Sequence, residues 1–191
     1  MLSYISLALG SILVSNVILV QFLGICPFLG VSKRKKQAFG MGVAVIGVVF
    51  FSSIITYGLY HLVLLPLDIE YTKIVIFILV IASLVQFVEL LIKKYFPSLY
   101  KDFGVYLPLI TTNCVVLGVA LNNITFAYNF LEMCVYSLSI SIGYMLVIFI
   151  FSSIREQLEK APVPKAFKGV PIALITAAFM ALAFSGFAGI V

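Results

Sequence analysis

The sequence predicts an all-α integral membrane protein with six transmembrane helices. Of its 191 residues, 63% are apolar and 10% are charged, whereas soluble domains are about 45–50% apolar and about 25% charged. The mean hydropathy is +1.23, and the apolar residues gather in six long runs separated by short polar breaks. This composition excludes a water-soluble globular domain. A net charge of +5 that lies in membrane loops does not indicate nucleic-acid binding.

Each of the six runs is long enough to cross a bilayer, whose core of about 30 Å needs roughly 20 apolar residues in a helix. The runs are 2–25, 38–62, 72–92, 103–121, 130–154 and 169–190. No Lys or Arg precedes the first run, so we expect it to be a span and not a cleavable signal peptide. No break is long enough to hold a second domain, and residues 1–191 are expected to form a single membrane domain.

The breaks between the runs differ in charge. They are 32–36, 66–70, 93–102, Asn122-Asn123 and 155–168. Eleven of the 12 Lys and Arg residues lie in the first, third and fifth breaks, and the opposite side carries only Lys73. Because basic residues stay in cytoplasmic loops, we predict that both termini are extracytoplasmic. We also expect the loop from Arg155 to Lys168 to be solvated.

A local internal repeat joins the two halves of the chain. Residues 17–31 align with residues 105–119, with six identities in fifteen positions that include all of C-x-x-L-G-V. The repeats are 1–95 and 96–191, and three spans in each force the second copy to enter the membrane inverted. In folds of this type, sites form near the midplane at broken helices. Gly and Pro residues near the two cysteine motifs predict such breaks in spans one and four.

The repeat places Cys26 and Cys114 at equivalent positions, whereas Cys134 has no counterpart. A lone cysteine in a membrane helix is ordinarily a small packing residue. Two cysteines at equivalent positions of an inverted repeat favour ligation instead. Two thiolates make half of the four that a [2Fe–2S] cluster needs, so a partner would supply the rest. Zinc is the weaker candidate, because a closed structural site would gain little from a position at the midplane.

Two segments of the chain carry a resemblance to a known family. Residues 26–33, CPFLGVSK, and residues 107–120, LPLITTNCVVLGVA, closely resemble the family of A-type subunits of the Rnf complex. That complex is an ion-translocating ferredoxin:NAD⁺ oxidoreductase of the prokaryotic cytoplasmic (inner) membrane. The likeness extends over the whole chain. The homologous E-type subunit of the sodium-pumping NADH:quinone oxidoreductase is also similar, but it reads C-T-F where this chain has Cys26-Pro27-Phe28.

The resemblance implies a function that composition and spacing do not give. It implies that Cys26 and Cys114 ligate a [2Fe–2S] cluster shared with the E-type subunit of the Rnf complex, which is a homologue of opposite orientation. Further partners would be the D-type and G-type flavin subunits and the soluble B-type and C-type subunits. In that picture, electrons pass from ferredoxin across the membrane to NAD⁺ and are coupled to Na⁺ or H⁺ translocation. The chain would have no catalytic residue and no activity alone.

Four other polar residues are candidates for a functional role. Thr111, Thr112 and Asn113 precede Cys114 and could donate hydrogen bonds to cluster sulfurs, or could satisfy the backbone locally at a helix break. Glu89 lies inside the third run. An intramembrane acid indicates an ion path, but Lys93 stands four residues later and an i,i+4 ion pair is the simpler interpretation.

Two alternative functions remain open from the residues alone. A self-contained secondary transporter would use the same inverted repeat and would explain Glu89, but it leaves the matched cysteines as structural coincidences. A scaffold that only holds partner subunits is the third option. Absorption and EPR spectra of the chain purified with its partners separate both alternatives from a redox protein.

Overall fold

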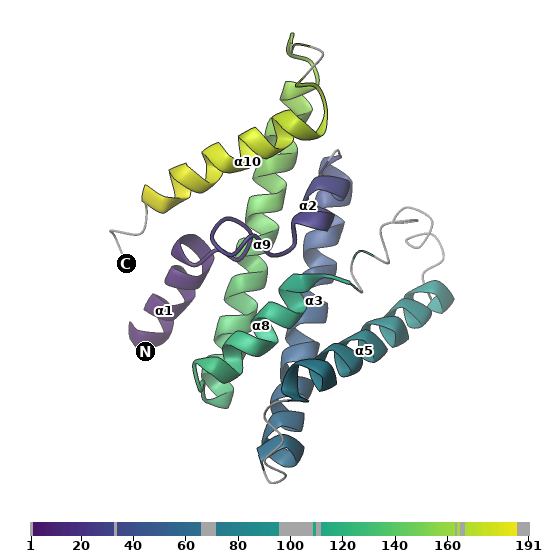
Figure 1. The fold of residues 1–191 in the computed structure, drawn as a ribbon, viewed down its shortest axis with the longest axis vertical. Coiled ribbons are helices and arrows are strands. Elements are labelled where there is room, and N and C mark those ends of the chain that lie inside the picture. The colour runs from purple at the N-terminus through teal and green to yellow at the C-terminus, as the bar shows by residue number, and fades with distance from the viewer. Residues whose placement is uncertain are drawn as a thin grey trace.

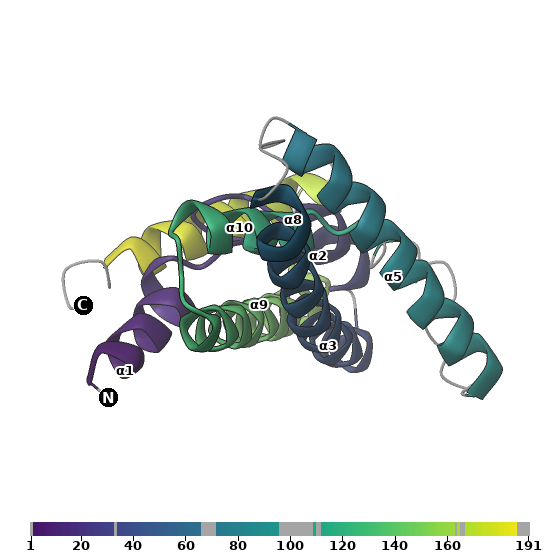
Figure 2. The ribbon, with the colours of Figure 1, turned by 90° about the horizontal axis from the view of Figure 1, so that it is seen from below.

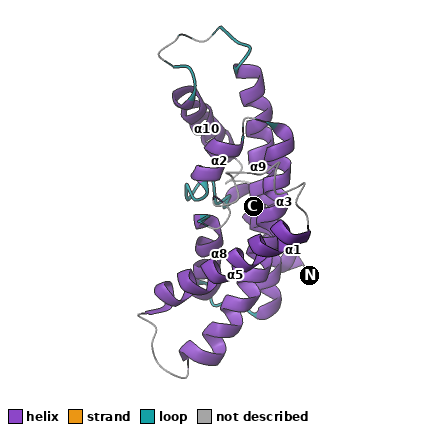
Figure 3. Ribbon diagram, turned by 90° about the vertical axis from the view of Figure 1, so that its right-hand side faces the viewer, coloured by secondary structure: helices purple, strands orange, loops and turns teal. Residues whose placement is uncertain are grey.

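The protein is helical throughout the part of the chain that the structure describes. This computed structural model describes residues 2–32, 34–65, 72–95, 109, 112–162, 164 and 167–186, and Figures 1 and 3 show helices joined by short connections. The helices are α1 (Leu2–Leu9), α2 (Ile25–Val31), α3 (Lys35–Leu59), α5 (Lys73–Tyr95), α8 (Cys114–Thr125), α9 (Phe130–Leu158) and α10 (Val170–Ser185), with π-helical extensions η1 (Gly10–Val14) and η2 (Tyr60–Leu64).

Within these residues, three helices are long and apolar enough to cross a membrane: 35–64, 73–90 and 130–158. They correspond to three of the six predicted runs. Shorter apolar helices at 4–14, 114–125 and 170–185 overlap the other three. The predicted class of apolar, all-α protein is therefore confirmed, while the remaining three runs form helices shorter than a full span in the residues described.

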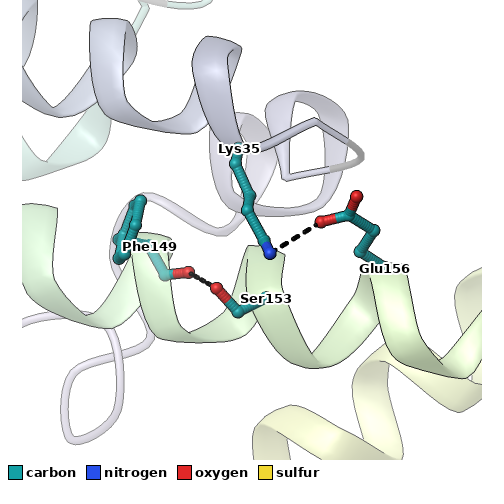
Figure 4. A network of polar contacts seen from close by, with 4 residues as sticks. All are labelled: Lys35, Phe149, Ser153 and Glu156. Carbon is teal, nitrogen blue, oxygen red and sulfur yellow. Dashed lines mark hydrogen bonds and ion pairs between the residues drawn. The ribbon is translucent and has the colours of Figure 1, made fainter.

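Helices α3 and α9 form the centre of the molecule and pack against each other along much of their length (Figure 2). Small residues allow this approach: a Cβ atom on Gly42 of α3 would lie 2.5 Å from Cγ of Met145 of α9. Near one end, Lys35 Nζ forms a salt bridge of 3.0 Å with Glu156 Oε2 (Figure 4). The two helices thus make a rigid pair against which α2 and α8 are held.

The first predicted run, 2–25, is interrupted. Helix α1 continues through η1 to Val14, and regular helix resumes only at Ile25. Asn16 stabilises the interruption: its Nδ2 donates to the Ile12 carbonyl at 3.1 Å, and its Oδ1 accepts from the Ile18 N–H at 3.2 Å. A buried non-helical segment needs such partners for its backbone, and the break falls just before Cys26, where the sequence predicts one.

The fourth predicted run, 103–121, and the break after it are wrong in part. Helix α8 begins at Cys114 and continues through Asn122 and Asn123 to Thr125, while 103–108 and 110–111 lie outside the described residues. Asn123 is buried and its Nδ2 donates to Ser137 Oγ of α9 at 3.1 Å. Polar residues that bond to a neighbouring helix do not end a helix. The turn comes later, before the capping box of Asn129 and Glu132.

The predicted loop 155–168 is also wrong at its start. Helix α9 continues to Leu158, and Arg155, expected to be solvated, is only 7% exposed. Its guanidinium finds hydrogen-bond acceptors inside the protein, which offset the cost of removing a charge from water. The last run, 169–190, appears as α10 from Val170 to Ser185, and 187–191 lie outside the described residues.

Candidate functional site

Cys26 and Cys114 both lie in the first turn of a short helix, and the structure brings those two turns together. Cys26 is the second residue of α2, and Cys114 is the first residue of α8. The backbone N–H of Gly24, which caps α2, donates to the Sγ atom of Cys114 at 2.9 Å. The amino ends of α2 and α8, which carry partial positive charge, therefore meet at the Cys114 sulfur. Cys26 is exposed and Cys114 is half-buried.

Gly24 is required at this meeting point for two reasons. Its backbone is left-handed, with φ of +80°, a conformation that residues with side chains rarely adopt. A Cβ atom on Gly24 would also lie 2.6 Å from Val115 Cγ2 and 2.8 Å from Tyr144 Cε2. Any larger residue would push α2 away from α8 and α9, so glycine is what permits the contact with Cys114.

Asn113 caps α8 and also presents an unused donor. Its Oδ1 accepts from the Val115 N–H at 3.1 Å, which satisfies one of the free amides at the helix start. Its Nδ2 is buried and has no hydrogen-bond partner among the described residues. A buried donor left unpaired costs about 1–3 kcal/mol. Asn113 therefore both fixes the start of α8 and offers an N–H beside Cys114.

Tyr144 of α9 presents a second unused donor at the same place. The side chain is fully buried, and its ring is in contact with Gly24. Its hydroxyl lies beside the Asn113 side chain and within electrostatic reach of both Cys26 and Cys114, yet no described residue accepts or donates a hydrogen bond to it. Two unpaired donors next to two thiols are suited to an electron-rich, hydrogen-bond-accepting group.

The number of ligands in the site is small. Across the described ranges, no three His, Cys, Asp or Glu side chains lie close enough together to hold a metal ion. Cys134 stands ten residues before Tyr144 on α9, which places it about 15 Å away along the helix at 1.5 Å per residue. This part of the chain therefore offers two thiols at the site and not three.

Thr111, Thr112 and Glu89 fall in different places. Thr112 is exposed in the turn before Asn113, and Thr111 lies outside the described residues. Glu89 is half-buried on α5, a helix that packs against α3 and α8. Among the salt bridges of the described chain, none joins Glu89 to Lys93, so the i,i+4 ion pair expected from the sequence is not formed.

Arg155 also belongs to this region, although the sequence places it in a solvated loop. Its Nη1 donates to the Leu29 carbonyl at 2.6 Å and to Ser32 Oγ at 2.8 Å, at the carboxyl end of α2. Phe28 of α2 stacks on Phe151 of α9 with ring centroids 4.0 Å apart. Arg155 thus holds the helix that carries Cys26. The helical spacing from Phe151 to Arg155 puts them on one face, and that periodicity could have revealed its burial.

Comparison with known proteins agrees with this architecture. The profile of the Rnf-Nqr family, described as "Rnf-Nqr subunit, membrane protein", matches residues 4–191. The chain is 53% identical over 188 residues to the A component of the "Na(+)-translocating ferredoxin:NAD(+) oxidoreductase complex" of Acetobacterium woodii, with 98% of each chain covered. It is 50% identical over 191 residues to the A component of the "Ion-translocating oxidoreductase complex" of Erwinia tasmaniensis, covering 100% of this chain and 99% of the relative. The chain therefore belongs to the Rnf-Nqr family of membrane subunits.

Proposed function

We propose that this chain is the A-type subunit of an ion-translocating ferredoxin:NAD⁺ oxidoreductase of the prokaryotic cytoplasmic membrane. In this proposal Cys26 and Cys114 are two of the four ligands of an intramembrane [2Fe–2S] cluster. The observation that carries it is the 2.9 Å hydrogen bond from the Gly24 N–H to Cys114 Sγ, which joins the two cysteine-bearing helices. The names of the relatives, full-length matches near 50% identity, supply the redox reaction and the ion transport.

The residues around the two thiols fit such a cluster. An iron–sulfur cluster is ligated by thiolates and is anionic, and its sulfurs accept hydrogen bonds. The unpaired donors of Asn113 and Tyr144 and the amino ends of α2 and α8 all favour negative charge at the same point. A purely structural pair of thiols would leave those donors without a reason.

The other two ligands would come from a homologous partner. The described part of this chain gathers only two thiols at the site, and Cys26 is exposed, as a ligand that faces another protein must be. An inverted repeat in each of two homologues would pair the site across a pseudo-two-fold axis. In this proposal the partner is the E-type subunit in the opposite orientation, and the D-type and G-type flavin subunits and the soluble B-type and C-type subunits complete the electron path.

Each residue of the site then has a defined role. When bound, the cluster accepts and donates one electron. Cys26 and Cys114 hold it, and the Gly24 N–H stabilises added negative charge on the Cys114 sulfur. The Tyr144 hydroxyl and Asn113 Nδ2 do the same from the protein side. On the carboxyl side of Cys26, the Phe28 ring stacks on Phe151, and both side chains are fully buried, which excludes water beneath α2.

Ion translocation would follow from the same electrostatics. Added charge in an apolar environment is costly unless dipoles or cations offset it, so reduction should favour the arrangement that brings a cation or more N–H groups near the sulfurs. Two inverted three-helix repeats (1–95 and 96–191), with both termini extracytoplasmic, would supply inward-open and outward-open arrangements. Glu89 is the candidate residue for Na⁺ or H⁺ uptake.

The first test is the cluster content of the purified membrane complex. We expect iron, acid-labile sulfide and visible absorption to fall by the share of one [2Fe–2S] cluster in the Cys26→Ser/Cys114→Ser double variant. Deletion of the E-type subunit should remove the same share from the remaining complex. Cys134→Ser is the matched control and should keep the full content. An unchanged content in the double variant would exclude these two residues as ligands.

A further inference from the structure

A cavity of about 730 Å³ lies at the end of the molecule where α2 and α9 end and α10 begins, at the top of Figure 1. Its walls include Leu29, Arg155, Glu159, Lys168 and Val170. We call it the α2–α10 cavity. It is separate from the amino end of α2, where Cys26 lies, so its occupant is not the group that the cysteines hold.

The α2–α10 cavity contains a buried positive charge that the protein does not neutralise. Arg155 is only 7% exposed, and both of its hydrogen bonds come from Nη1, leaving Nε and Nη2 without a protein acceptor in the described structure. No carboxylate of the described residues forms an ion pair with it. Buried charges are normally paired. The guanidinium therefore has unused donors and lacks a counter-anion at the cavity wall.

The charges around the opening also favour an anion. Lys168 lines the cavity and is exposed, next to the amino end of the 16-residue helix α10. Glu159 is the one acidic residue of the lining that the structure describes. Two cations and the positive end of a helix outweigh one exposed carboxylate. Guanidinium groups with free N–H donors bind phosphate oxygens well.

The size and walls of the cavity distinguish a lipid from a free ion. A volume of about 730 Å³ is in the range of about 300–1,000 Å³ typical of sites for larger organic ligands. Leu29, Leu158, Val170 and Ile172 make much of the lining apolar, which suits glycerol and acyl groups. The cavity also lies where the helices α2, α9 and α10 have their ends, and basic residues at the ends of membrane helices attract anionic headgroups.

We propose that the α2–α10 cavity binds an anionic phospholipid, with its phosphate at Arg155 and Lys168 and its glycerol and upper acyl chain against the apolar walls. Such a lipid would neutralise Arg155, which fixes the carboxyl end of α2. The bound lipid would therefore stabilise the packing of α2 on α9. Neither the cavity nor its charges depend on the proposed cluster.

Photolabelling of the purified complex tests this directly. The complex is placed in nanodiscs of phosphatidylcholine that contain phosphatidylglycerol with a photoreactive group near its glycerol, and labelled peptides are identified by mass spectrometry. We expect labelling of peptides that contain Leu158 or Val170. Lys168→Gln should weaken this labelling by about fivefold, the effect of one basic residue near a lipid surface. Lys160→Gln removes an exposed charge from the same loop, outside the cavity lining, and is the control.

The remaining arms identify the source of the phosphate. The same photoreactive group on phosphatidylcholine should label these peptides weakly, and inorganic phosphate should not compete. Equal labelling by phosphatidylcholine, or labelling that Lys168→Gln leaves unchanged, would overturn the proposal. Competition by inorganic phosphate would assign the site to a free ion instead and would equally overturn the lipid. Because Lys168 is exposed, its substitution does not place folding at risk.

Discussion

The backbone N–H of Gly24 donates a hydrogen bond to the Sγ atom of Cys114 over 2.9 Å, although the residues are 90 positions apart in the chain. This contact joins the starts of α2 and α8, and Tyr144 of α9 closes it from the third side. The site is therefore held by three helices that meet at one glycine. Its geometry depends on that glycine, on the unpaired donors nearby and on the residue that holds the far end of α2.

Gly24→Ala should disrupt the site. The left-handed backbone alone makes alanine unfavourable by about 1–3 kcal/mol, and the new Cβ would overlap Val115 and Tyr144. We expect a lower unfolding temperature of the purified complex and loss or distortion of the cluster signal. Gly47→Ala is the matched control, since nothing lies within 4 Å of a Cβ at that position. Equal melting temperatures for the two variants would contradict the role of Gly24.

Tyr144→Phe should lower the reduction potential of the cluster by tens of millivolts while leaving the fold intact. The substitution removes a hydroxyl that has no described partner, so no protein hydrogen bond is lost. If that donor stabilises the reduced cluster, its removal makes reduction harder. The measurement is a potentiometric EPR titration of the complex.

Tyr136→Phe is the control for this substitution, because the Tyr136 hydroxyl accepts from Asn122 Nδ2 at 3.3 Å and lies elsewhere on α9. A midpoint that shifts equally in both variants, or in neither, would remove Tyr144 from the surroundings of the cluster.

Arg155→Gln should destabilise the protein by about 3 kcal/mol, since hydrogen bonds from a charged donor are worth about 1.5–3 kcal/mol each and this residue makes two at the end of α2. Its neighbour Glu156 is the control. Glu156→Gln breaks only the exposed pair with Lys35, which should change stability by less than about 1 kcal/mol. Thermal unfolding of the complex compares them, and similar losses would mean that Arg155 does not hold α2.

Ion coupling predicts that the midpoint potential of the cluster depends on the transported cation. Linkage requires an ion that prefers the reduced arrangement to raise the potential as its concentration rises. Potentiometric EPR at several Na⁺ concentrations and several pH values identifies that ion. Glu89→Gln should diminish the shift. A midpoint that neither Na⁺ nor pH changes would leave the chain as an electron carrier without coupling, and an undiminished shift in the variant would exclude Glu89.

Composition and the length of the apolar runs are enough to predict an all-α membrane protein, because long apolar helices are what a bilayer permits. Hydropathy cannot tell where a helix is broken inside an apolar run. It missed that α8 starts at Cys114 and carries Asn122 and Asn123, because an Asn bonded to the next helix resembles a loop residue in the sequence.

The candidate site was predicted only in outline. The internal repeat indicated that Cys26 and Cys114 belong together, since repetition in register does not depend on packing. Gly24, Tyr144 and Arg155 could not be found in the same way. Their roles come from contacts between α2, α8 and α9, which are distant in the chain. A basic residue at the end of an apolar run reads as a loop residue until its acceptors on α2 are seen.

The central claim is that Cys26 and Cys114 hold one redox centre. The most direct measurement is spin-quantified EPR of the dithionite-reduced complex carrying each single substitution, Cys26→Ser, Cys114→Ser or Cys134→Ser. We expect the first two to lose or shift the same [2Fe–2S] signal and to abolish electron transfer from ferredoxin to NAD⁺, while the third keeps both. An intact and unshifted signal in Cys26→Ser or Cys114→Ser, or an equal loss in all three, would contradict it.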